Sequence, residues 1–317
     1  MDAFEKLLLL YRKRRFLVVN PRGSKGDRLI FMGMEKKLKE VRIDYSAFEY
    51  KVKSPFHEIA LSVERKLAQL GLEIVGKDLL NAVSPLVGMM DRKVHTIRNS
   101  SASVILLRGG AYLNDLWKEY HILVNANYVI RNKPDSTLVI APQSYLFTTT
   151  KFPEFFMDIR QEVHLFCRER YSYDKCCGMC FPENVHIYLS PDTALYLTKE
   201  DFDLQKSEHE SDYLLIAPRK DRESAVTWNL GARDLRKKTL VGDVMEVRDF
   251  RSFLDLVWNA SEIHTDRLHV AILSAILGKE TRLYPNIYYK NKGVYEFSLC
   301  TFPNVKFIDS YKYASEN

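Results

Sequence analysis

The segment Ile263–Gly278 sets the strongest constraint on how this 317-residue chain folds. It opens with Thr265–His269 (TDRLH), where a carboxylate, a guanidinium and an imidazole stand directly before the almost wholly apolar run Val270–Leu277. A helix that is apolar on all sides is buried, and charged groups at its first turn are costly unless partners or a ligand satisfy them. The sequence therefore predicts a buried helix with Thr265 as its N-cap and Gly278 as its terminator.

The charged start of this helix predicts an anion site. Arg267 and His269 are two residues apart and do not share a helix face, so both reach one ligand only in front of the helix end. Free backbone N–H groups and the helix dipole favour an anion at that place. A purely structural interpretation stays open, in which Asp266 caps the helix, Arg267 forms a salt bridge and His269 bonds a backbone carbonyl.

The sequence predicts two α/β halves. Buried strands alternate with helices on both sides of the charged, polar segment Lys199–Ser211. We expect an N-terminal Rossmann-like domain over residues 1–200 and a C-terminal one over residues 201–317, each with a mostly parallel sheet. Ligands in such folds bind beyond the carboxyl ends of the strands. This organisation predicts a cleft between the two domains.

The apolar runs and their periodicity predict the individual elements. The expected strands are Phe16–Val19, Tyr45–Glu49, Ser103–Leu107, Thr137–Ala141, Val185–Leu189, Asp212–Ala217, a segment near Asp243–Val247, and Thr281–Tyr284. The expected helices are Met1–Arg15, Arg28–Glu40, Phe56–Leu70, Asn114–Val124, Glu154–Cys167, Phe250–Ala260 and the helix that begins at Thr265.

Two glycine loops of the first half are candidate ligand contacts. Gly23–Asp27 is neither a Walker loop nor a GxGxxG motif, but its glycines let the backbone approach a ligand, and Asp27 can accept a hydroxyl hydrogen. Arg108 ends a buried strand before Gly109 and Gly110, and a charge at that place needs a partner. Tight strand-to-helix turns are the alternative for both loops.

A third candidate loop, Arg219–Glu223, ends the first strand of the second half. Arg219 offers a planar fork for a carboxylate or phosphate, and Asp221 and Glu223 could orient that fork. Alternating charges at a strand end are also typical of a solvated loop, and this alternative stays open.

The composition is that of an ordinary folded protein with a modest positive charge. Hydrophobic residues make up 46% of the chain and charged residues 28%, and the net charge is +6. The basic residues are spread along the sequence rather than clustered. This balance favours small acidic ligands or a membrane-surface contact over a dedicated nucleic-acid binder.

Five cysteines, an odd number, do not suggest a disulfide framework. Cys177 and Cys180 have metal-ligand spacing, but no second such pair completes a tetrahedral site, so we expect no metal. Leu7–Leu10 is too short for the apolar core of a signal peptide, and Arg12–Arg15 follows it. We expect a cytoplasmic location, with Arg12–Arg15 either touching an anionic membrane surface or ending a helix that caps the first domain.

Together these segments resemble the polysaccharide pyruvyl transferase family. Thr265–His269 is similar to the family's TDRLH motif, and Arg219–Glu223 is similar to its RxDxE loop. Leu283–Glu296 resembles the following strand and Asn-x-Tyr-x-Lys-Asn loop, in which Lys290 and Asn291 are the last two motif positions. The resemblance spans most of the chain.

The first half carries shorter matches in the same order. They are Gly23–Asp27, the Gly109–Gly110 turn and the D-x-A-L ending within Ser190–Leu195. Ala111 stands where the family often has a third glycine, and Cys176–Cys180 matches no motif of the family. These departures concern contacts with the acceptor more than contacts with the donor.

The resemblance implies a glycosyltransferase-B-like pair of Rossmann-like domains and an enzyme of polysaccharide biosynthesis. The implied donor is phosphoenolpyruvate, held by the C-terminal domain, and no separate cofactor is needed. The implied acceptor is a sugar of an exopolysaccharide or another glycan, or of a lipid-linked oligosaccharide, held partly by the N-terminal domain. The product is a sugar that carries pyruvate as a cyclic ketal, with release of phosphate.

The same resemblance implies roles for individual residues. Arg219 and Arg267 are expected to clamp the two anionic groups of the donor. The N–H groups at the Leu268 turn add to this site, and His269 donates to the phosphate or acts as general acid or base. The other expected substrate-binding residues are Asp221, Glu223, Gly109, Gly110, Lys290 and Asn291, with Asp27 and Asn114 on the acceptor side.

Two alternatives stay open at this point. A nucleotide-sugar glycosyltransferase of the same architecture would also use basic residues and a helix N-terminus for its diphosphate. The sequence shows no obvious carboxylate that reads a base or ribose, which disfavours it. A non-catalytic carbohydrate-binding relative is the second alternative, and the intact set of Arg219, Arg267 and His269 argues against it.

Overall fold

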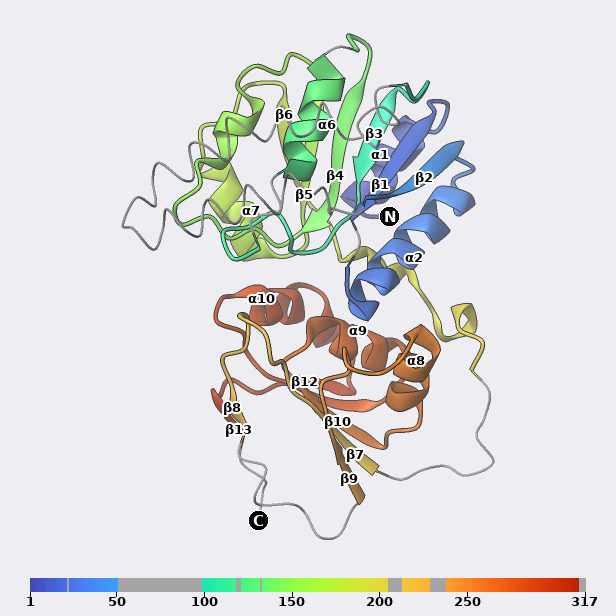
Figure 1. Cartoon of the computed structure of the whole chain (residues 1–317), viewed down its shortest axis with the longest axis vertical. Coiled ribbons are helices and arrows are strands. Elements are labelled where there is room, and N and C mark those ends of the chain that lie inside the picture. Colours follow the sequence, from blue (N-terminus) through green and yellow to red (C-terminus); the bar gives the residue numbers. More distant parts are fainter. Residues whose placement is uncertain are drawn as a thin grey trace.

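Most of the described strands form two parallel sheets, one above the other along the long axis of the molecule (Figure 1). The computed structural model describes residues 1–21, 23–50, 99–117, 121–131, 133–204, 213–228 and 238–313. The expected helix Phe56–Leu70 lies outside these residues. The predicted class, two Rossmann-like α/β halves with parallel sheets, is confirmed.

The N-terminal sheet has six parallel strands in the order β2-β1-β3-β4-β5-β6. Their bounds are β1 Phe16–Pro21, β2 Tyr45–Tyr50, β3 Val104–Leu107, β4 Thr137–Gln143, β5 Val163–Cys167 and β6 Val185–Leu189. The helices of this half are α1 Ala3–Leu10, α2 Lys25–Glu40, α6 His121–Arg131 and α7 Arg170–Cys177. Both faces of the sheet are covered, because Val18 and Val139 pack in the cluster that contains α1 and α2, while Val19 and Leu138 pack with α6.

The C-terminal sheet has five parallel strands in the order β12-β11-β10-β7-β9. Their bounds are β7 Tyr213–Ala217, β9 Lys238–Val241, β10 Glu262–Thr265, β11 Glu280–Leu283 and β12 Val305–Phe307. The helices are α8 Phe250–Trp258, α9 Leu268–Ile276 and α10 Lys290–Phe297, and the short strands β8 Thr227–Trp228 and β13 Lys312–Tyr313 pair with each other. Leu215 and Ile263 of the sheet share one apolar cluster with side chains of α8 and α9.

Three element predictions are wrong in part. Glu154–Cys167 is not one helix: Phe152–Phe156 forms a 3₁₀ helix, and Val163–Cys167 is strand β5, because a short apolar run becomes a strand when β4 and β6 pair with it on both sides. Asp243–Val247 forms turns rather than a strand. The expected helix Asn114–Val124 gives way to a turn at its start, and the helix there is α6.

The start of the TDRLH helix also differs from its prediction. Thr265 is the last residue of β10 and not a helix N-cap, because Glu262–Thr265 pairs with both β7 and β11. Its Oγ1 donates to the carbonyl oxygen of Ala217 at 2.7 Å and accepts from the N–H of Arg267 at 3.0 Å. Arg267 is the N-cap of α9. Gly278, with a φ of 70°, follows the helix as predicted.

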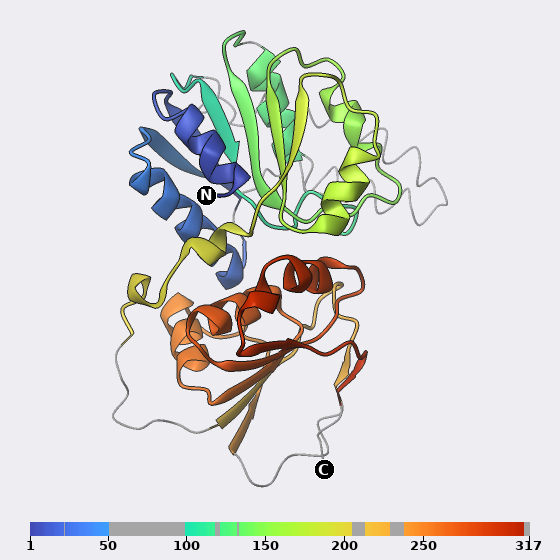
Figure 2. The same cartoon turned by 180° about the vertical axis from the view of Figure 1, so that it is seen from behind.

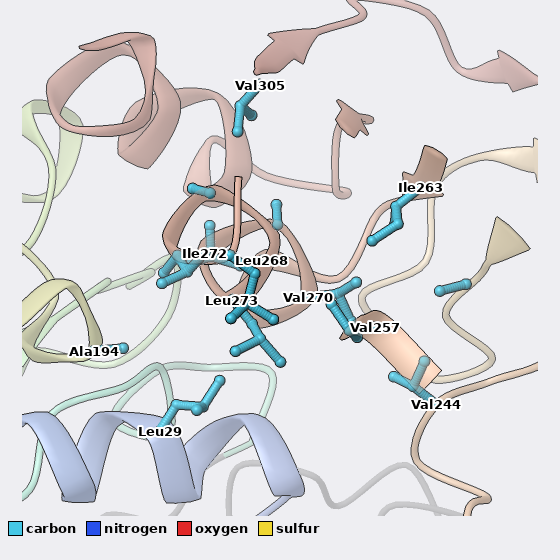
Figure 3. Packing of buried hydrophobic residues seen from close by; sticks show 14 of the residues in the cluster. Leu29, Ala194, Val244, Val257, Ile263, Leu268, Val270, Ile272, Leu273 and Val305 are labelled. Carbon is cyan, nitrogen blue, oxygen red and sulfur yellow. The ribbon is translucent and has the colours of Figure 1, made fainter. Parts of the chain in front are cut away.

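Helix α2 joins the two halves. It extends from the N-terminal sheet towards α9 in both views of the molecule (Figure 1 and Figure 2). Leu29 of α2 is fully buried and belongs to the apolar cluster of the C-terminal half, where Leu268 and Leu273 of α9 also lie (Figure 3). Burying these side chains together stabilises the placement of α2 against α9. The N-terminal ends of both helices therefore meet at the boundary between the halves.

Gly33→Ala should destabilise the protein, because α2 passes very close to the 3₁₀ helix η2, Thr193–Tyr196. A Cβ at Gly33 would overlap the carbonyl oxygen of Thr193, so backbone must shift. We expect the free energy of unfolding to fall by about 1–3 kcal/mol in urea titrations. Gly242→Ala is the matched control, since a Cβ there meets nothing within 4 Å. Equal stability of both variants would contradict the close approach of α2 and η2.

Candidate active site

A cavity of about 430 Å³ lies between the two halves. Its walls come from the start of α2, the segments after β3, β5 and β7, the start of α9 and the start of α10. The described lining residues are Gly23, Ser24, Gly26, Asp27, Arg108, Ala111, Tyr112, Trp117, Arg168, Arg219, Asp221, Glu223, Val244, Met245, Phe253, Arg267, Leu268, His269, Val270 and Lys290. Eight of the twelve predicted site residues thus line one cavity, where the carboxyl ends of both sheets face each other.

Strand register explains why Arg219 and Arg267 converge. β7 and β10 are parallel neighbours, and Ala217 pairs with Thr265 at their ends. Each arginine follows its strand by two residues, so both emerge at the same edge of the sheet. The backbone N–H of Arg219 donates to Oδ1 of Asp266 at 2.7 Å, which ties the two exit loops together.

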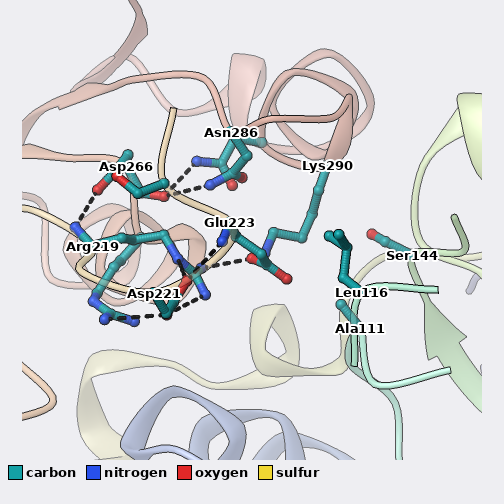
Figure 4. Close-up of polar contacts among 12 residues, drawn as sticks. Ala111, Leu116, Ser144, Arg219, Asp221, Glu223, Asp266, Asn286 and Lys290 are labelled. Atoms are coloured by element: carbon teal, nitrogen blue, oxygen red, sulfur yellow. Dashed lines mark hydrogen bonds and ion pairs between the residues drawn. The ribbon is translucent and has the colours of Figure 1, made fainter. Parts of the chain in front are cut away.

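The Arg219 guanidinium is held by two carboxylates of its own loop (Figure 4). Its Nε and Nη2 donate to the two oxygens of Asp221 at 3.0 and 2.9 Å, and Nη1 lies 2.9 Å from Oε2 of Glu223. Such a fork-to-fork pair fixes the guanidinium plane. Asp221 and Glu223 therefore orient Arg219, as expected from the sequence, and the alternative of a purely solvated loop is wrong because Arg219 and Glu223 are largely buried.

Arg267 lies beside Arg219 and is also buried. Its Nη2 bonds to Asp243 and lies 3.5 Å from Oδ2 of Asp221. Its Nε has no hydrogen-bond partner among the described residues. Two guanidinium groups thus share the Asp221 carboxylate at the wall of the cavity, and an unsatisfied donor of Arg267 is buried there.

Lys290 adds a further buried cation through α10. Its Nζ contacts Glu223, whose Oε1 also accepts from Nε1 of Trp117 at 2.8 Å. Glu223 therefore bridges the C-terminal half to a loop of the N-terminal half. Burial lowers the pKa of Lys290 to about 8, and the nearby charges of Arg219 and Arg168 act in the same direction against the pull of Glu223.

The N-terminal wall of the cavity has its own ion pair. Nη1 of Arg108 donates to Oδ1 of Asp27 at 2.8 Å, and Nη2 donates to the carbonyl oxygen of Pro21. Asp27 also closes a capping box with Ser24 at the start of α2. Burial raises the pKa of the Asp27 carboxyl, but the charges of Arg108 and His269 outweigh burial and lower it well below its usual range.

His269 projects from the first turn of α9 and lines the same cavity. Its Nε2 lies 3.4 Å from Oδ2 of Asp192 and not against a backbone carbonyl. Asp266 does not cap the helix either, since Oδ1 of its carboxylate accepts from Arg219. The purely structural interpretation of TDRLH is thus correct only for the salt bridge of Arg267.

Four predicted binding residues do not line the cavity: Gly109, Gly110, Asn114 and Asn291. Asn291 is buried, and its Nδ2 donates to the carbonyl oxygens of Asp266 and Tyr284 at 2.7 and 2.8 Å. It therefore ties α10 to the exit loop of β10 rather than facing the cavity.

The other three of these residues shape the loop after β3. Oδ1 of Asn114 accepts the backbone N–H of Trp117 at 2.9 Å, which helps place that aromatic ring at the cavity wall. Gly110 has a φ of 137°, a conformation that L side chains rarely adopt. A Cβ at Gly109 would overlap the carbonyl oxygen of Pro142, so the close approach of the loop after β3 to strand β4 requires glycine there.

The sequence analysis missed Arg168 and Trp117, and it gave no role to Asp192, the first position of the D-x-A-L ending. Arg168 follows the buried strand β5 directly, and a charge at a buried strand end is the signal that singled out Arg108. The incorrect helix at Glu154–Cys167 concealed it. Trp117 carried no signal, because its loop is placed by contacts with Asn114 and Glu223 that only the finished fold shows.

Three other features can be stated for the described part of the chain. No group of three or more His, Cys, Asp or Glu side chains there is placed to hold a metal ion. Cys176 is buried, whereas Cys177 and Cys180 are exposed. No described helix has the length and apolar character needed to cross a bilayer.

The sequence profile of the family described as polysaccharide pyruvyl transferase matches residues 25–286, which is most of the chain. This protein belongs to that family. Membership of the polysaccharide pyruvyl transferase family implies that this protein is a transferase that acts on polysaccharides. The match includes the loops with Arg108 and Arg219 and the TDRLH segment, and it stops just before Lys290. No curated protein matches the sequence of this pyruvyl transferase family member.

A solved structure shows the shared fold. A functionally uncharacterized protein of Klebsiella pneumoniae subsp. pneumoniae NTUH-K2044 is similar over 97% of each chain, with 22% identity and a TM-score of 0.59. A UDP-N-acetylglucosamine 2-epimerase is similar over 89% of this chain and 81% of its own, with 12% identity and a TM-score of 0.49. A putative UDP-N-acetylglucosamine 2-epimerase of Listeria monocytogenes is similar over 88% of this chain and 81% of its own, with 10% identity and a TM-score of 0.47.

Lys290→Met should remove a pH dependence of stability at mildly alkaline pH. The folded-state pKa of about 8 is lower than that of an unfolded lysine, near 10.4, so the unfolded state binds more protons between these values. Across this window the free energy of unfolding of the wild type should rise with pH relative to the variant, by up to about 3 kcal/mol. Chemical denaturation at pH values from about 7.5 to 10 measures this difference.

Lys292→Met, in the same helix but partly exposed and paired with Asp309, is the control. It should keep the wild-type slope. Identical pH slopes for the wild type and Lys290→Met would show that Lys290 keeps an ordinary pKa and is not buried as the structure has it.

Proposed function

We propose that this protein transfers pyruvate from phosphoenolpyruvate to a sugar of a polysaccharide or glycan precursor, forming a cyclic ketal and releasing phosphate. The observation that supports this proposal most directly is the common cavity of Arg219, Arg267 and His269, three groups brought together from two loops and a helix. Membership of the polysaccharide pyruvyl transferase family supports it independently.

The charge of the cavity suits this donor. Phosphoenolpyruvate is small and carries both a carboxylate and a phosphate, so its site needs more than one cation. Among the described lining residues, five arginine or lysine side chains stand against three carboxylates, while Asp192 and Asp243 pair with two of these cations from outside the lining. In the proposal, Arg219 and Arg267 clamp the two anionic groups, and the N–H groups at the Leu268 turn of α9 add a helix N-terminus. Lys290 adds a point charge to the same wall.

The N-terminal wall suits an acceptor sugar. Asp27 offers a carboxylate, and Tyr112 and Trp117 offer aromatic surface beside it. Aromatic rings combine apolar area with a polar edge, which fits a sugar ring better than a bare anion. Of the two acceptor contacts proposed from sequence, Asp27 remains, whereas Asn114 acts through the placement of Trp117. A lipid-linked acceptor and a contact with the membrane surface stay predictions.

The proposed chemistry proceeds in three stages. A proton adds to the methylene carbon of the donor, which becomes a methyl group and leaves C2 electrophilic. A sugar hydroxyl loses its proton as its oxygen bonds to C2, and the bond from C2 to the phosphate oxygen breaks. The second hydroxyl then bonds to C2 and loses its proton, which closes the ketal. The two hydroxyl protons released equal the two protons taken up, one by the methylene carbon and one by the departing phosphate. His269 moves protons in this scheme.

Arg267→Ala and His269→Ala should each abolish most of the release of phosphate from phosphoenolpyruvate. Removing a preorganised group that stabilises developing charge costs about 10²–10³-fold in kcat. Phosphate release with an accepted glycan measures the effect, and circular dichroism with thermal unfolding confirms the fold. Exposed Arg248→Ala and partly exposed His186→Ala, at two positions that do not line the cavity, are the controls. Near-wild-type turnover of either cavity variant would remove that residue from the mechanism.

Arg219→Lys should also be poorly active, although it keeps the positive charge. A lysine is a point charge and cannot reproduce the bidentate contact with Asp221 or present a planar fork to the donor. We expect a rise in the KM for phosphoenolpyruvate of about tenfold or more, equal to about 1.4 kcal/mol of lost binding. Arg248→Lys is the matched control. An unchanged KM would show that the guanidinium of Arg219 does not contact the donor.

The products separate this proposal from its alternatives. Release of a nucleoside diphosphate from a nucleotide sugar, in place of phosphate from phosphoenolpyruvate, would identify a glycosyltransferase. Absence of phosphoenolpyruvate binding in calorimetry, together with binding of a glycan, would identify a non-catalytic relative.

A further inference from the structure

Asp192 contacts His269 from outside the loops that form the predicted site. It follows β6 as the N-cap of η2, in the segment that leads from the N-terminal sheet to the C-terminal one. Its side chain is fully buried. Oδ2 lies 3.4 Å from Nε2 of His269, and Oδ1 accepts the backbone N–H of Ala194 at 2.9 Å. A carboxylate of the first half thus reaches the imidazole of the second half.

Asp192 is itself fixed by a buried cation. Nη1 of Arg168 donates to Oδ2 of Asp192 at 2.6 Å, and Nε of Arg168 donates to Oγ of buried Ser144 at 2.8 Å. The side chain of Arg168 is 1% exposed. Burial raises the pKa of Asp192, but the charges of Arg168 and His269 and the N–H of Ala194 outweigh burial and lower it below its usual range. The carboxylate therefore remains ionised beside the imidazole.

Gly26 borders the imidazole on the α2 side. A Cβ at this position would lie 2.7 Å from Cβ of His269 and 2.9 Å from its Nδ1, which is too close for either atom. Only glycine allows the ring its observed place. The charged groups that face the ring are therefore Asp192 from the segment after β6, with Arg168 behind it, and Asp27 from α2.

We propose that Asp192 is a positioning residue for His269: it accepts the Nε2 proton, fixes the ring and its tautomer, and leaves Nδ1 to exchange protons with the substrate. Arg168 and Ser144 hold Asp192 in turn. A buried carboxylate with this relation to a catalytic histidine selects the tautomer and stabilises the imidazolium without taking its proton. This inference rests on the proposed function, because it assigns His269 the proton transfer in pyruvyl transfer.

Asp192→Asn tests the assignment, since it keeps the shape but removes the charge that selects the tautomer. We expect kcat to fall about 10²–10⁴-fold, with the KM for phosphoenolpyruvate changed less than about threefold, because donor binding uses other groups. Asp201→Asn is the matched control: Asp201 lies in the same connecting segment, pairs with Lys36 of α2 at 2.6 Å and does not line the cavity. It should leave kcat unchanged.

The same substitution in the His269→Ala background separates positioning from a structural role. If Asp192 acts through His269, Asp192→Asn should not lower the residual rate of His269→Ala any further. A further loss of equal size would show a structural role and overturn the proposal. Gly26→Ala provides a second variant with intact Asp192, and it should lower kcat at least tenfold because its added Cβ displaces the His269 ring.

A spectroscopic readout makes the result independent of turnover. In ¹⁵N-histidine NMR spectra, with the His269 signals identified by their loss in His269→Ala, the wild type should hold the proton on Nε2, and Asp192→Asn should give a mixture of tautomers. An unchanged tautomer in Asp192→Asn would overturn the proposal. If the wild type released no phosphate from phosphoenolpyruvate, the proposed function would fail, and the tautomer alone would decide whether Asp192 positions His269.

Discussion

The burial of several cations at one cavity is the constraint on which the rest of this structure depends. An unpaired buried charge is strongly unfavourable, so each cation needs a carboxylate at a fixed place. Arg108 has Asp27, Arg168 has Asp192, Arg267 has Asp243, and Arg219 and Lys290 share Glu223. These partners come from both halves and from the segment between them. The same ion pairs that offset the cost of burying the cations also hold the cations in place before any ligand binds.

The contact between α2 and α9 gives this network its shape. Leu29 packs into the core of the C-terminal half, and Gly26 and Gly33 allow α2 to lie against His269 and Thr193. Both helices therefore start at the cavity with their N–H groups turned to the same boundary, which favours an anion. Apolar packing sets the position of the helices, and the ion pairs set the chemistry of the space between their ends.

The sequence predicted the convergence of Arg219, Arg267 and His269 because parallel strands place their exit loops along one edge. The register of Ala217 with Thr265 brings Arg219 and Arg267 to that edge. The sequence could not predict the place of Arg168. A five-residue apolar run such as Val163–Cys167 is compatible with a helix or a strand until its neighbours in the fold are known. Nor could the sequence predict that Glu223 joins Trp117 to Lys290, since contacts between residues so far apart in sequence depend on the finished fold.

The central claim is that one anionic donor is held jointly by the two exit loops and the start of α9. A crystal structure of the protein soaked with phosphoenolpyruvate tests it most directly. The account predicts density for the donor within the cavity, with one anionic group on the Arg219 guanidinium, the other on Arg267, and the His269 ring within hydrogen-bond distance. Density at another place, or contact with only one of these three groups, would contradict it.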